Sequence, residues 1–421
     1  MAISYKDKVE EDNTYILSTK ASLKFSKEGK LDKINALVDE YRRVTSLFVD
    51  ILWPIDFKDI PPLLTIEITS KVDTWLSKRL VQSAGKQASG IVRGTKKKQV
   101  KRLAQIEKFK QLGMFKKARK LQRICDKVVL SKPKIQEVCP ELDSRFVDIN
   151  LSNDTVFDGW VSLSSLTNKE TEKMEIHLPF KKTKHFNKML QMGCIKKGVR
   201  LSKSSITFMF NIEKAPLRTM GITLGLDIGM KTALSFSNGV TSGKDIHGHD
   251  LDSICKKLCR KLKGSKAFWR AQQHRDNHIN WCFNLIDFTG VKRLNIEKIE
   301  NLRKGKKTSR YLSHFVYTKD KEKLDRLLPK TGVLLGEYSP AYTSQRCSRC
   351  GWTRKANRKG KKFVCTACGF ACDADINASV NLSLDLCEIS RKERLKHKSK
   401  KGFFWYALGQ EPIVPVVQKV A

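Results

Sequence analysis

Four cysteines stand in two closely spaced pairs that suit a metal: Cys347, Cys350, Cys365 and Cys368. Two residues separate the members of each pair, and this spacing lets four thiolates reach one tetrahedral zinc ion. Gly351 and Gly369 follow the pairs, where a turn around a metal favours a residue without Cβ. The pattern predicts a zinc ribbon with one structural Zn²⁺ held by all four sulfurs.

Other cysteines and histidines offer a weaker metal pattern. Cys372 is close enough to be a fifth ligand, but the symmetry of the two pairs favours a free thiol. A second set could also bind a metal: His247, His249, Cys255 and Cys259. The two cysteines of this set lie four residues apart in a helical segment, so we expect them to face the core instead.

Three acidic residues stand at positions where a carboxylate needs a cation. Asp227 lies near the end of the apolar strand ITLGLDIG, Glu297 ends VKRLNIE, and Asp375 opens the helical segment DADINASVNLSL. A charged group at the end of a buried strand is costly unless positive charge meets it. Three such carboxylates can bind two Mg²⁺ ions, which activate water and stabilise the leaving oxygen of a phosphodiester.

Each acid alone has a simpler explanation as a helix cap or a surface charge. Asp375 is the clearest case, because an aspartate near a helix N-terminus is stabilised by the helix dipole. Gly225 and Gly229 flank Asp227 and allow the backbone of another element to approach closely.

The charge of the chain indicates a polyanionic partner. The 421 residues include 82 Lys and Arg against 43 Asp and Glu, a formal charge of +39 that is spread along most of the sequence. Nucleic acid is the expected partner, because phosphates release counterions when lysine and arginine bind them. A merely soluble surface needs much less charge.

Length and hydropathy set further limits. A chain of 421 residues is expected to form two to four domains. No segment has the roughly 18 apolar residues of a membrane span, and the first residues lack the apolar core of a signal peptide. We therefore expect no membrane partner and a cytoplasmic, nucleoid-associated location.

The N-terminal half is predicted to form a β domain with a helical insertion. A strand is expected over 14–25, helices over 31–53 and 64–83, and a basic helical surface over 90–134. The basic segment has an apolar stripe but almost no acidic residues, which favours phosphate binding over an ordinary solvated face. Strand-like runs within 145–215 would complete the first strand in an antiparallel unit.

The C-terminal half changes character after Pro216. ITLGLDIGMKTALSFSNGV predicts a β-hairpin, and helices are expected over 251–262 and 269–288. The strands VKRLNIEKI and GVLLGEYS follow before the cysteines. The basic segment RKERLKHKSKKGFF near the end is expected to be mobile or bound to phosphate.

Four segments resemble the successive RuvC-type motifs of the TnpB family of transposon-encoded RNA-guided nucleases, to which the miniature type V CRISPR effectors are related. They are GLDIGMKTALSFSNG, LNIEKIENL, SPAYTSQRCSRCG and CGFACDADINASVNL. The resemblance is specific over Ile222 to Leu382 and looser over Glu175 to Glu213. It implies that Asp227, Glu297 and Asp375 are the three catalytic carboxylates. A shifted alignment would choose Glu300 and Asp373 instead of the second and third.

The resemblance also implies an α+β multidomain fold with an RNase H-like, RuvC-type nuclease domain built on a mixed five-stranded sheet. This nuclease would occupy 219–342 and 373–388, with the zinc ribbon inserted at 343–372. An N-terminal β-barrel wedge domain would cover 1–30 and 145–218, and a helical recognition lobe 31–144 would be inserted in it. A basic tail, 389–421, follows.

The function that this resemblance implies is RNA-guided DNA cleavage. A guide RNA would pair with one strand of a double-stranded DNA target, and a centre with two Mg²⁺ ions, or Mn²⁺ in their place, would hydrolyse DNA. Two alternatives remain open: an RNA-guided repressor that binds without cutting, and a RuvC-type nuclease that needs no guide. Whether the protein is a monomer or a homodimer also stays open.

Overall fold

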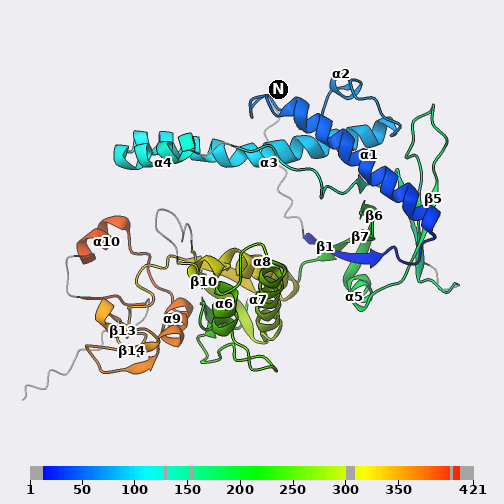
Figure 1. Cartoon of the computed structure of the whole chain (residues 1–421). Coiled ribbons are helices and arrows are strands. Elements are labelled where there is room, and N and C mark those ends of the chain that lie inside the picture. Colours follow the sequence, from blue (N-terminus) through cyan, green and yellow to red (C-terminus); the bar gives the residue numbers. More distant parts are fainter. Residues whose placement is uncertain (1–12, 128–129, 152–154, 300–308, 399–401, 408–421) are drawn as a thin grey trace, which may run out of the picture. The chain divides into compact units, whose positions relative to one another are not determined.

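The computed structural model describes residues 13–127, 130–151, 155–299, 309–398 and 402–407 (Figure 1). The chain divides into two compact units, Met1–Glu213 and Lys214–Ala421. None of the helices in the described ranges is long and apolar enough to cross a membrane.

The first unit contains a four-stranded antiparallel sheet in the order β1-β7-β6-β2. Its strands are β1 (Thr14–Ser22), β7 (Ser205–Glu213), β6 (Gly193–Leu201) and β2 (Glu141–Leu142). Strands β1 and β7 pair along their whole length, from Thr14 opposite Glu213 to Ser22 opposite Ser205. The prediction that the first strand pairs with a distant segment is therefore confirmed.

A second sheet in this unit has the order β3-β4-β5, with β3 (Val147–Asn150), β4 (Gly159–Leu163) and β5 (Ile176–Phe180). Within the described ranges no strand pair joins the two sheets. In place of the expected closed β-barrel, the structure therefore has two sheets that share one hydrophobic core. Helix α5 (Lys184–Met192) and strand β6 were not predicted. The lysine-containing sequence of β6 hides its strand pattern, and a register shift interrupts its pairing between Ile195 and Val199.

Four helices lie between β1 and β2 in the sequence: α1 (Glu28–Leu52), α2 (Ile66–Thr69), α3 (Lys78–Gln111) and α4 (Phe115–Lys127). Helix α1 confirms the predicted helix at 31–53. The single helix predicted over 64–83 is found only in part, as α2 and the start of α3, because Leu76 between them forms an antiparallel bridge with Thr167. Helix α3 begins only after Ser77, whose hydroxyl accepts the Leu80 N–H at 3.4 Å.

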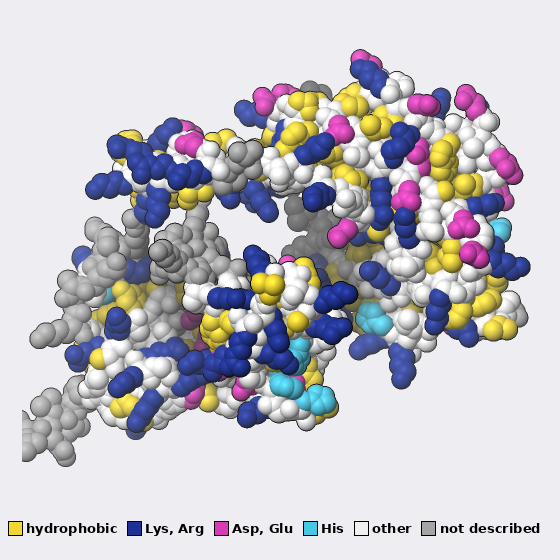
Figure 2. All heavy atoms as spheres, in the orientation of Figure 1, with side chains coloured by type: hydrophobic (Ala, Val, Ile, Leu, Met, Phe, Trp, Pro, Cys, Tyr) yellow, Lys and Arg dark blue, Asp and Glu magenta, His cyan; other side chains and the backbone are white. Residues whose placement is uncertain are grey.

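The predicted basic helical segment is confirmed as helical in α3 and α4. Ile106 is buried against Leu121 and Cys125 of α4, whereas Val100 and Leu103 remain 36% and 44% exposed. The outer surface of α4 carries exposed basic side chains: Lys116, Lys117, Arg119, Lys120 and Arg123. Figure 2 shows Lys and Arg gathered over this end of the helical region.

The second unit is built on a mixed sheet in the order β11-β10-β8-β9. It comprises β11 (Leu334–Tyr338), β10 (Val291–Glu297), β8 (Ile222–Ile228) and β9 (Leu234–Phe236). The antiparallel pair β8 and β9 confirms the predicted hairpin, and β10 is parallel to both of its neighbours. The described part of this sheet has four strands instead of the expected five. After β9 the chain turns back but pairs at only one position, the bridge between Ser235 and Thr241.

Alternation along β8 separates its two faces. Leu224 and Leu226 join the core formed with α6 (Leu251–Cys259), α7 (Lys266–Asn284) and α8 (Tyr317–Leu327). The next residues, Gly225 and Asp227, point to the opposite face. There α9 (Ala374–Ser383) packs against β8, and a Cβ on Gly225 would lie 1.9 Å from the Ser379 carbonyl oxygen. The predicted close backbone approach at Gly225 is therefore confirmed.

The remaining elements surround the cysteines. A three-stranded sheet has the order β13 (Arg358–Lys359), β14 (Lys362–Val364) and β15 (Ala371–Asp373). Strand β12 (Trp352–Thr353) pairs with β16 (Phe403–Phe404). Helix α10 (Arg391–Lys398) precedes β16 in the sequence. Short 3-10 helices cover Leu312–His314, Leu328–Lys330 and Lys355–Asn357.

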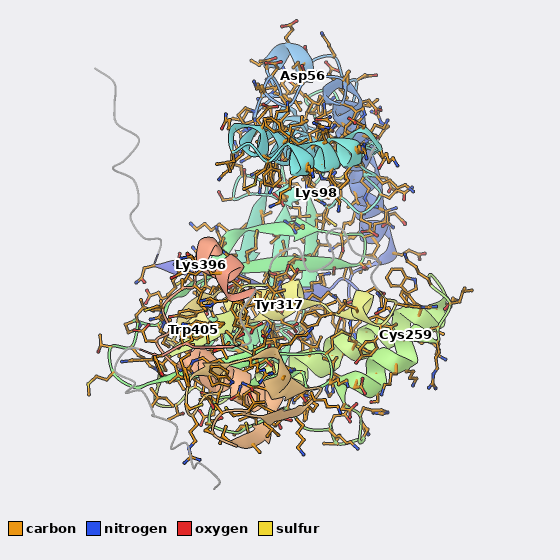
Figure 3. The ribbon with its side chains drawn as sticks, turned by 90° about the vertical axis from the view of Figure 1, so that its left-hand side faces the viewer. Asp56, Lys98, Cys259, Tyr317, Lys396 and Trp405 are labelled. Carbon is orange, nitrogen blue, oxygen red and sulfur yellow. The ribbon has the colours of Figure 1, made fainter. Side chains whose placement is uncertain are left out.

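The expectation that RKERLKHKSKKGFF is mobile is wrong at its last two residues, which form β16, whereas phosphate binding by this segment stays a prediction. Thr353 pairs with Phe403, and the Trp405 backbone N–H donates to the Gly351 carbonyl at 3.0 Å. The aromatic residues that follow the basic run supply this contact: the Phe404 ring packs against Trp352 at an interplanar angle of 55°, with ring centroids 4.9 Å apart. In Figure 3, Trp405 lies on the opposite side of the second unit from Cys259 on α6.

Gly225→Ala tests the contact between β8 and α9. The added methyl group would overlap backbone atoms of α9, so we expect a loss of about 1–3 kcal/mol in the free energy of unfolding. Denaturant unfolding of the full chain measures this change. Gly243→Ala is the control, because nothing lies within 4 Å of its added Cβ. Equal stability of the two variants would contradict the proposed packing.

Candidate metal-binding centres

The strand register brings two of the predicted carboxylates together. Ile296 of β10 is opposite Leu226 of β8, so the next positions in this register are Glu297 and Asp227. Neighbouring strands lie about 4.8 Å apart, and both acids are on the face that α9 covers. Asn295, two residues before Glu297, fixes that face by donating from its amide to the Leu382 carbonyl of α9 at 2.8 Å.

Helix α9 brings the third carboxylate to the same place. Asp227, Glu297 and Asp375 line one cavity of about 640 Å³, together with basic residues of the ribbon. Asp375 is buried at the start of α9, with 9% of its side chain exposed. The structure thus places all three carboxylates named from the sequence in a single cavity.

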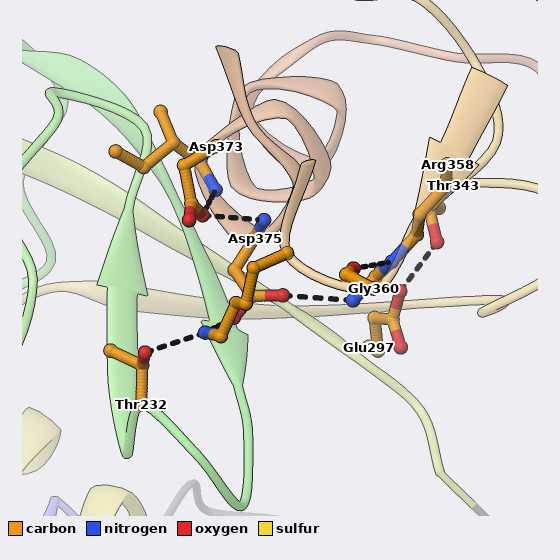
Figure 4. A network of polar contacts seen from close by, with 9 residues as sticks. Thr232, Glu297, Thr343, Arg358, Gly360, Asp373 and Asp375 are labelled. Carbon is orange, nitrogen blue, oxygen red and sulfur yellow. Dashed lines mark hydrogen bonds and ion pairs between the residues drawn. The ribbon is translucent and has the colours of Figure 1, made fainter. Parts of the chain in front are cut away.

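The two neighbouring aspartates of this segment have different surroundings (Figure 4). Asp373 is exposed and caps α9, since its carboxylate accepts the N–H groups of Asp375 at 2.8 Å and Ile376 at 3.2 Å. Asp375 instead faces the cavity. The helix-cap explanation considered for Asp375 therefore belongs to Asp373, and Glu300, the other alternative, lies outside the described residues.

Residues that sequence reasoning missed hold Glu297 in place. The Thr343 hydroxyl donates to the Glu297 carboxylate, and the Tyr317 hydroxyl donates to the Glu297 backbone carbonyl. Both come from distant segments, and a lone threonine or tyrosine has no pattern that would identify this role. Burial raises the pKa of Glu297 above its ordinary value.

Asp227 has the most perturbed carboxyl of the cavity. Burial, followed by the charges of Glu297 and Asp375, raises its pKa to about 8, although Arg358 and Lys361 oppose this shift. The positive charges of Arg358 and Lys361 thus do not offset the effects of burial and of the neighbouring acids at Asp227. All three acids offer oxygen ligands, which Mg²⁺ prefers, so the residues present fit a magnesium centre.

Two basic side chains of the ribbon lie on the third acid (Figure 4). Arg358 donates from Nη2 to Asp375 at 2.9 Å, and Lys361 contacts the other carboxylate oxygen. Lys361 also donates to the Thr232 hydroxyl at 2.6 Å. Arg358 and Lys361 belong to the basic hairpin between the cysteine pairs, and both turn into the cavity.

The four predicted zinc ligands form one cluster: Cys347, Cys350, Cys365 and Cys368. The Sγ atoms of Cys347 and Cys368 are 3.8 Å apart, and those of Cys350 and Cys365 are 3.6 Å apart. Tetrahedral Zn–S bonds of about 2.3 Å place sulfurs about 3.8 Å from one another. The cluster is therefore consistent with a zinc ribbon, and Cys372 is not part of it.

The turns after the cysteine pairs confirm the prediction for both glycines. Gly351 has φ of 78° and Gly369 has φ of 71°, in the left-handed region that favours glycine. Gly351 also lies against the C-terminal strand, where a Cβ would be 2.8 Å from the Trp405 carbonyl oxygen.

Helix α9 also holds the base of the ribbon. The side chain of Arg346 is fully buried and donates to the Asn381 side chain and to the Trp405 carbonyl, both at 2.6 Å. The amides of Asn377 and Asn381 donate to the Arg346 carbonyl at 2.7 and 2.8 Å. The asparagines of DINASVNL therefore connect the helix that carries Asp375 to the first cysteine pair.

The second metal set considered from the sequence does not assemble. Cys255 is buried in the core, as predicted, whereas Cys259 is half-buried and His247 is exposed. His249 instead lies with Asp245 and His274 in a cluster of potential ligands. Sequence reasoning missed this group because Asp245 and His274 are separated by α6.

A family model described as Cas12f1-like, TNB domain, matches residues 317–382. A Cas12f1 endodeoxyribonuclease of Sulfoacidibacillus thermotolerans is 34% identical over 139 residues, 32% of each chain. A TnpB-like protein of Aquifex aeolicus is 34% identical over 92 residues, 20% of this chain and 30% of that protein.

Longer alignments are more distant. A putative RNA-guided DNA endonuclease, InsQ, of Escherichia coli is 24% identical over 252 residues, 51% of this chain and 62% of that protein. A structure of a Cas12f1–sgRNA–target DNA complex aligns with 88% of this chain and 99% of that one at 15% identity and a TM-score of 0.44. The chain belongs to the TnpB/Cas12f family of RNA-guided nucleases. The three protein alignments span 32%, 30% and 62% of those relatives.

Cys350→Ser is expected to remove one zinc ion per chain and to unfold the ribbon, whose own buried cluster is small. Elemental analysis measures the zinc, and hydrogen exchange measures protection over 347–373. Cys372→Ser is the control, because this thiol lies outside the cluster. A Cys350→Ser protein with wild-type zinc content and protection would refute the assigned ligands.

Asp227→Asn should stabilise the magnesium-free protein increasingly as pH rises. The pKa of Asp227 is raised from 3.8 to about 8, so the native state binds more protons than the unfolded state and loses stability across that interval. Asparagine removes this cost, so the gain in Tm over wild type should grow up to about pH 8. Each kcal/mol corresponds to about 2–4 °C for a unit of this size.

Thermal unfolding in buffer without Mg²⁺, with the zinc of the ribbon left in place, measures the difference across this pH range. Asp373→Asn serves as the control, because asparagine also caps a helix and Asp373 is exposed. A Tm difference between Asp227→Asn and wild type that does not change with pH would contradict the burial of this carboxyl.

Proposed function

We propose that this protein is an RNA-guided DNA endonuclease with a RuvC-type centre formed by Asp227, Glu297 and Asp375. The single observation that carries the proposal is the meeting of these acids, from β8, β10 and α9, in one cavity. Family membership supports the same activity. The RNase H-like architecture, the guide RNA and the double-stranded DNA target belong to this proposal.

The three acids would hold two Mg²⁺ ions, which supply an activated water and stabilise the leaving oxygen of the phosphodiester. Thr343 would keep the Glu297 carboxylate oriented. Arg358 and Lys361 neutralise Asp375 in the structure. Once cations replace them there, these two side chains are positioned to contact the phosphates of the strand in the cavity.

The first unit offers surfaces for a nucleic-acid backbone. A groove of about 840 Å³ has five basic residues in its lining, against the two acids Glu141 and Asp143: Arg79, Lys86, Arg145, Lys196 and Lys197. The exposed lysines and arginines of α4 provide a second basic surface. Both suit an RNA duplex that is held through its phosphates, while base pairing selects the DNA sequence. We propose that the helical insertion and the two sheets act as recognition lobe and wedge.

Cleavage of a plasmid that matches the bound RNA tests the proposal. The purified ribonucleoprotein should cut in Mg²⁺, and Asp375→Asn should reduce the rate by about 100-fold or more. Asp227→Ala should have the same effect. Asp373→Asn is the matched control only two residues away and should retain cleavage, because its side chain caps the helix.

The outcomes separate the alternatives. Equal cleavage by wild type and Asp375→Asn would refute the centre. Target binding without cleavage by the wild type would indicate an RNA-guided repressor. Cleavage that is unchanged after the RNA is removed would indicate a guide-independent nuclease.

A further inference from the structure

A group of histidines surrounds one aspartate outside the carboxylate cavity and the cysteine cluster. Asp245 and His249 lie in the loop between β9 and α6, while His274 and His278 lie four residues apart on α7. Residues one helical turn apart project from the same side of a helix. The loop and the helix therefore present their side chains to a common point.

Two backbone hydrogen bonds within its own loop hold the carboxylate of Asp245 in place. Its Oδ1 accepts the backbone N–H groups of His247 and His249, both at 2.9 Å. The same Oδ1 is 3.6 Å from His249 Nδ1. Its Oδ2 is 4.0 Å from His274 Nε2 and 3.7 Å from His278 Nδ1. Three imidazoles thus approach one carboxylate without reaching hydrogen-bonding distance.

Two of these ring nitrogens are buried polar atoms without a hydrogen bond among the described residues. They are Nδ1 of His249 and Nδ1 of His278, and the side chain of His278 is only 1% exposed. A buried polar atom that lacks a partner is costly, and such atoms often indicate an ion or water. Both nitrogens face the Asp245 carboxylate, the His249 nitrogen at Oδ1 and the His278 nitrogen at Oδ2. The His249 nitrogen identifies the side of the carboxylate where a partner would lie.

We propose that Asp245, His249 and His274 form a second metal site for a zinc-like divalent transition cation. One ligand atom from each of the three residues lies within 4.8 Å of the others. Tetrahedral bonds of about 2.0–2.1 Å separate ligand atoms by about 3.3–3.4 Å, so the side chains need to close by at most about 1.5 Å.

The donor set determines the class of metal. Two imidazoles and one carboxylate suit Zn²⁺ and its first-row neighbours, whereas Mg²⁺ and Ca²⁺ prefer oxygen ligands alone. The side chains of His249 and His274 are 42% and 33% exposed, so solvent can reach the site and complete the coordination with water. His278 would support Asp245 from the buried side, in the second coordination shell.

The site would fix the loop 245–249 to helix α7. This loop follows β9, which pairs with the strand that carries Asp227. A bound metal would therefore stabilise one edge of the sheet. The proposal does not depend on the proposed nuclease activity, because it rests on the ligand geometry alone.

A simpler explanation is a hydrogen-bonded loop with histidines nearby. The two backbone hydrogen bonds to Asp245 account for the loop, but they do not account for the position of His274 on another element. Ion pairs with protonated imidazoles would be expected to close to hydrogen-bonding distance, yet all three separations are 3.6 Å or more.

Zinc stoichiometry of the full chain tests the proposal. After equilibration with Zn²⁺ and removal of free metal, the wild type should hold one zinc ion more than the cysteine quartet binds. His249→Gln and His274→Gln should each lose that ion, since glutamine keeps the size and polarity but not the imidazole. His247→Gln is the matched control, because His247 is exposed and outside the cluster.

Cobalt substitution assigns each loss to its site. The thiolate-to-cobalt absorption of the cysteine cluster should persist in both histidine variants, while the weaker band of the second site disappears. Zinc bound by the ribbon should raise the Tm of both His247→Gln and His249→Gln. A further rise from the second site is expected in His247→Gln only. The exposed position of His249 makes this variant the test if His274→Gln fails to fold.

Other outcomes would overturn the proposal. They are a wild type with only the zinc of the cysteine quartet, histidine variants that retain the extra ion, or an equal loss in His247→Gln. The last result would show binding by exposed histidines in general. Because every measurement concerns metal content or stability, failure here leaves the cleavage test of the nuclease centre unaffected.

Discussion

The backbone contact between β8 and α9 is the constraint on which the second unit depends. Gly225 has no Cβ, so the helix can place the Ser379 carbonyl directly against the strand. Alternation along the strand then aims Asp227 at the same face, two residues further on. A wider separation would move Asp375 away from Asp227, because both acids are fixed to the two elements that meet at this contact.

The zinc ribbon is connected to the same helix at both ends of its sequence. Before the cysteines, Arg346 binds Asn381 of α9, and after the second pair the chain enters α9 through the cap residue Asp373. Between these points, Arg358 and Lys361 reach Asp375. The ribbon thus contributes to the charge balance of the carboxylate cavity, although its cysteine cluster shares no residue with the three acids.

Electrostatics distinguish the cavity from the rest of a strongly basic chain. Burial raises the pKa values of Asp227 and Glu297, and at Asp227 the charges of Glu297 and Asp375 add to this rise despite the nearby basic groups. Such a site favours bound cations over further arginine or lysine, since small ions can approach several oxygens at once. The formal charge of +39 would serve a different purpose, the neutralisation of phosphates over extended surfaces.

The sequence by itself determined the cysteine ligands, the strand ends at Asp227 and Glu297, and the hairpin between β8 and β9, because each depends on local spacing or alternation. Tertiary structure decided the rest. Only packing shows that Asp373 caps the helix while Asp375 faces the cavity, that Thr343 orients Glu297, and that Asp245 meets His274. These contacts join segments far apart in the chain, where no periodic pattern relates one residue to the other.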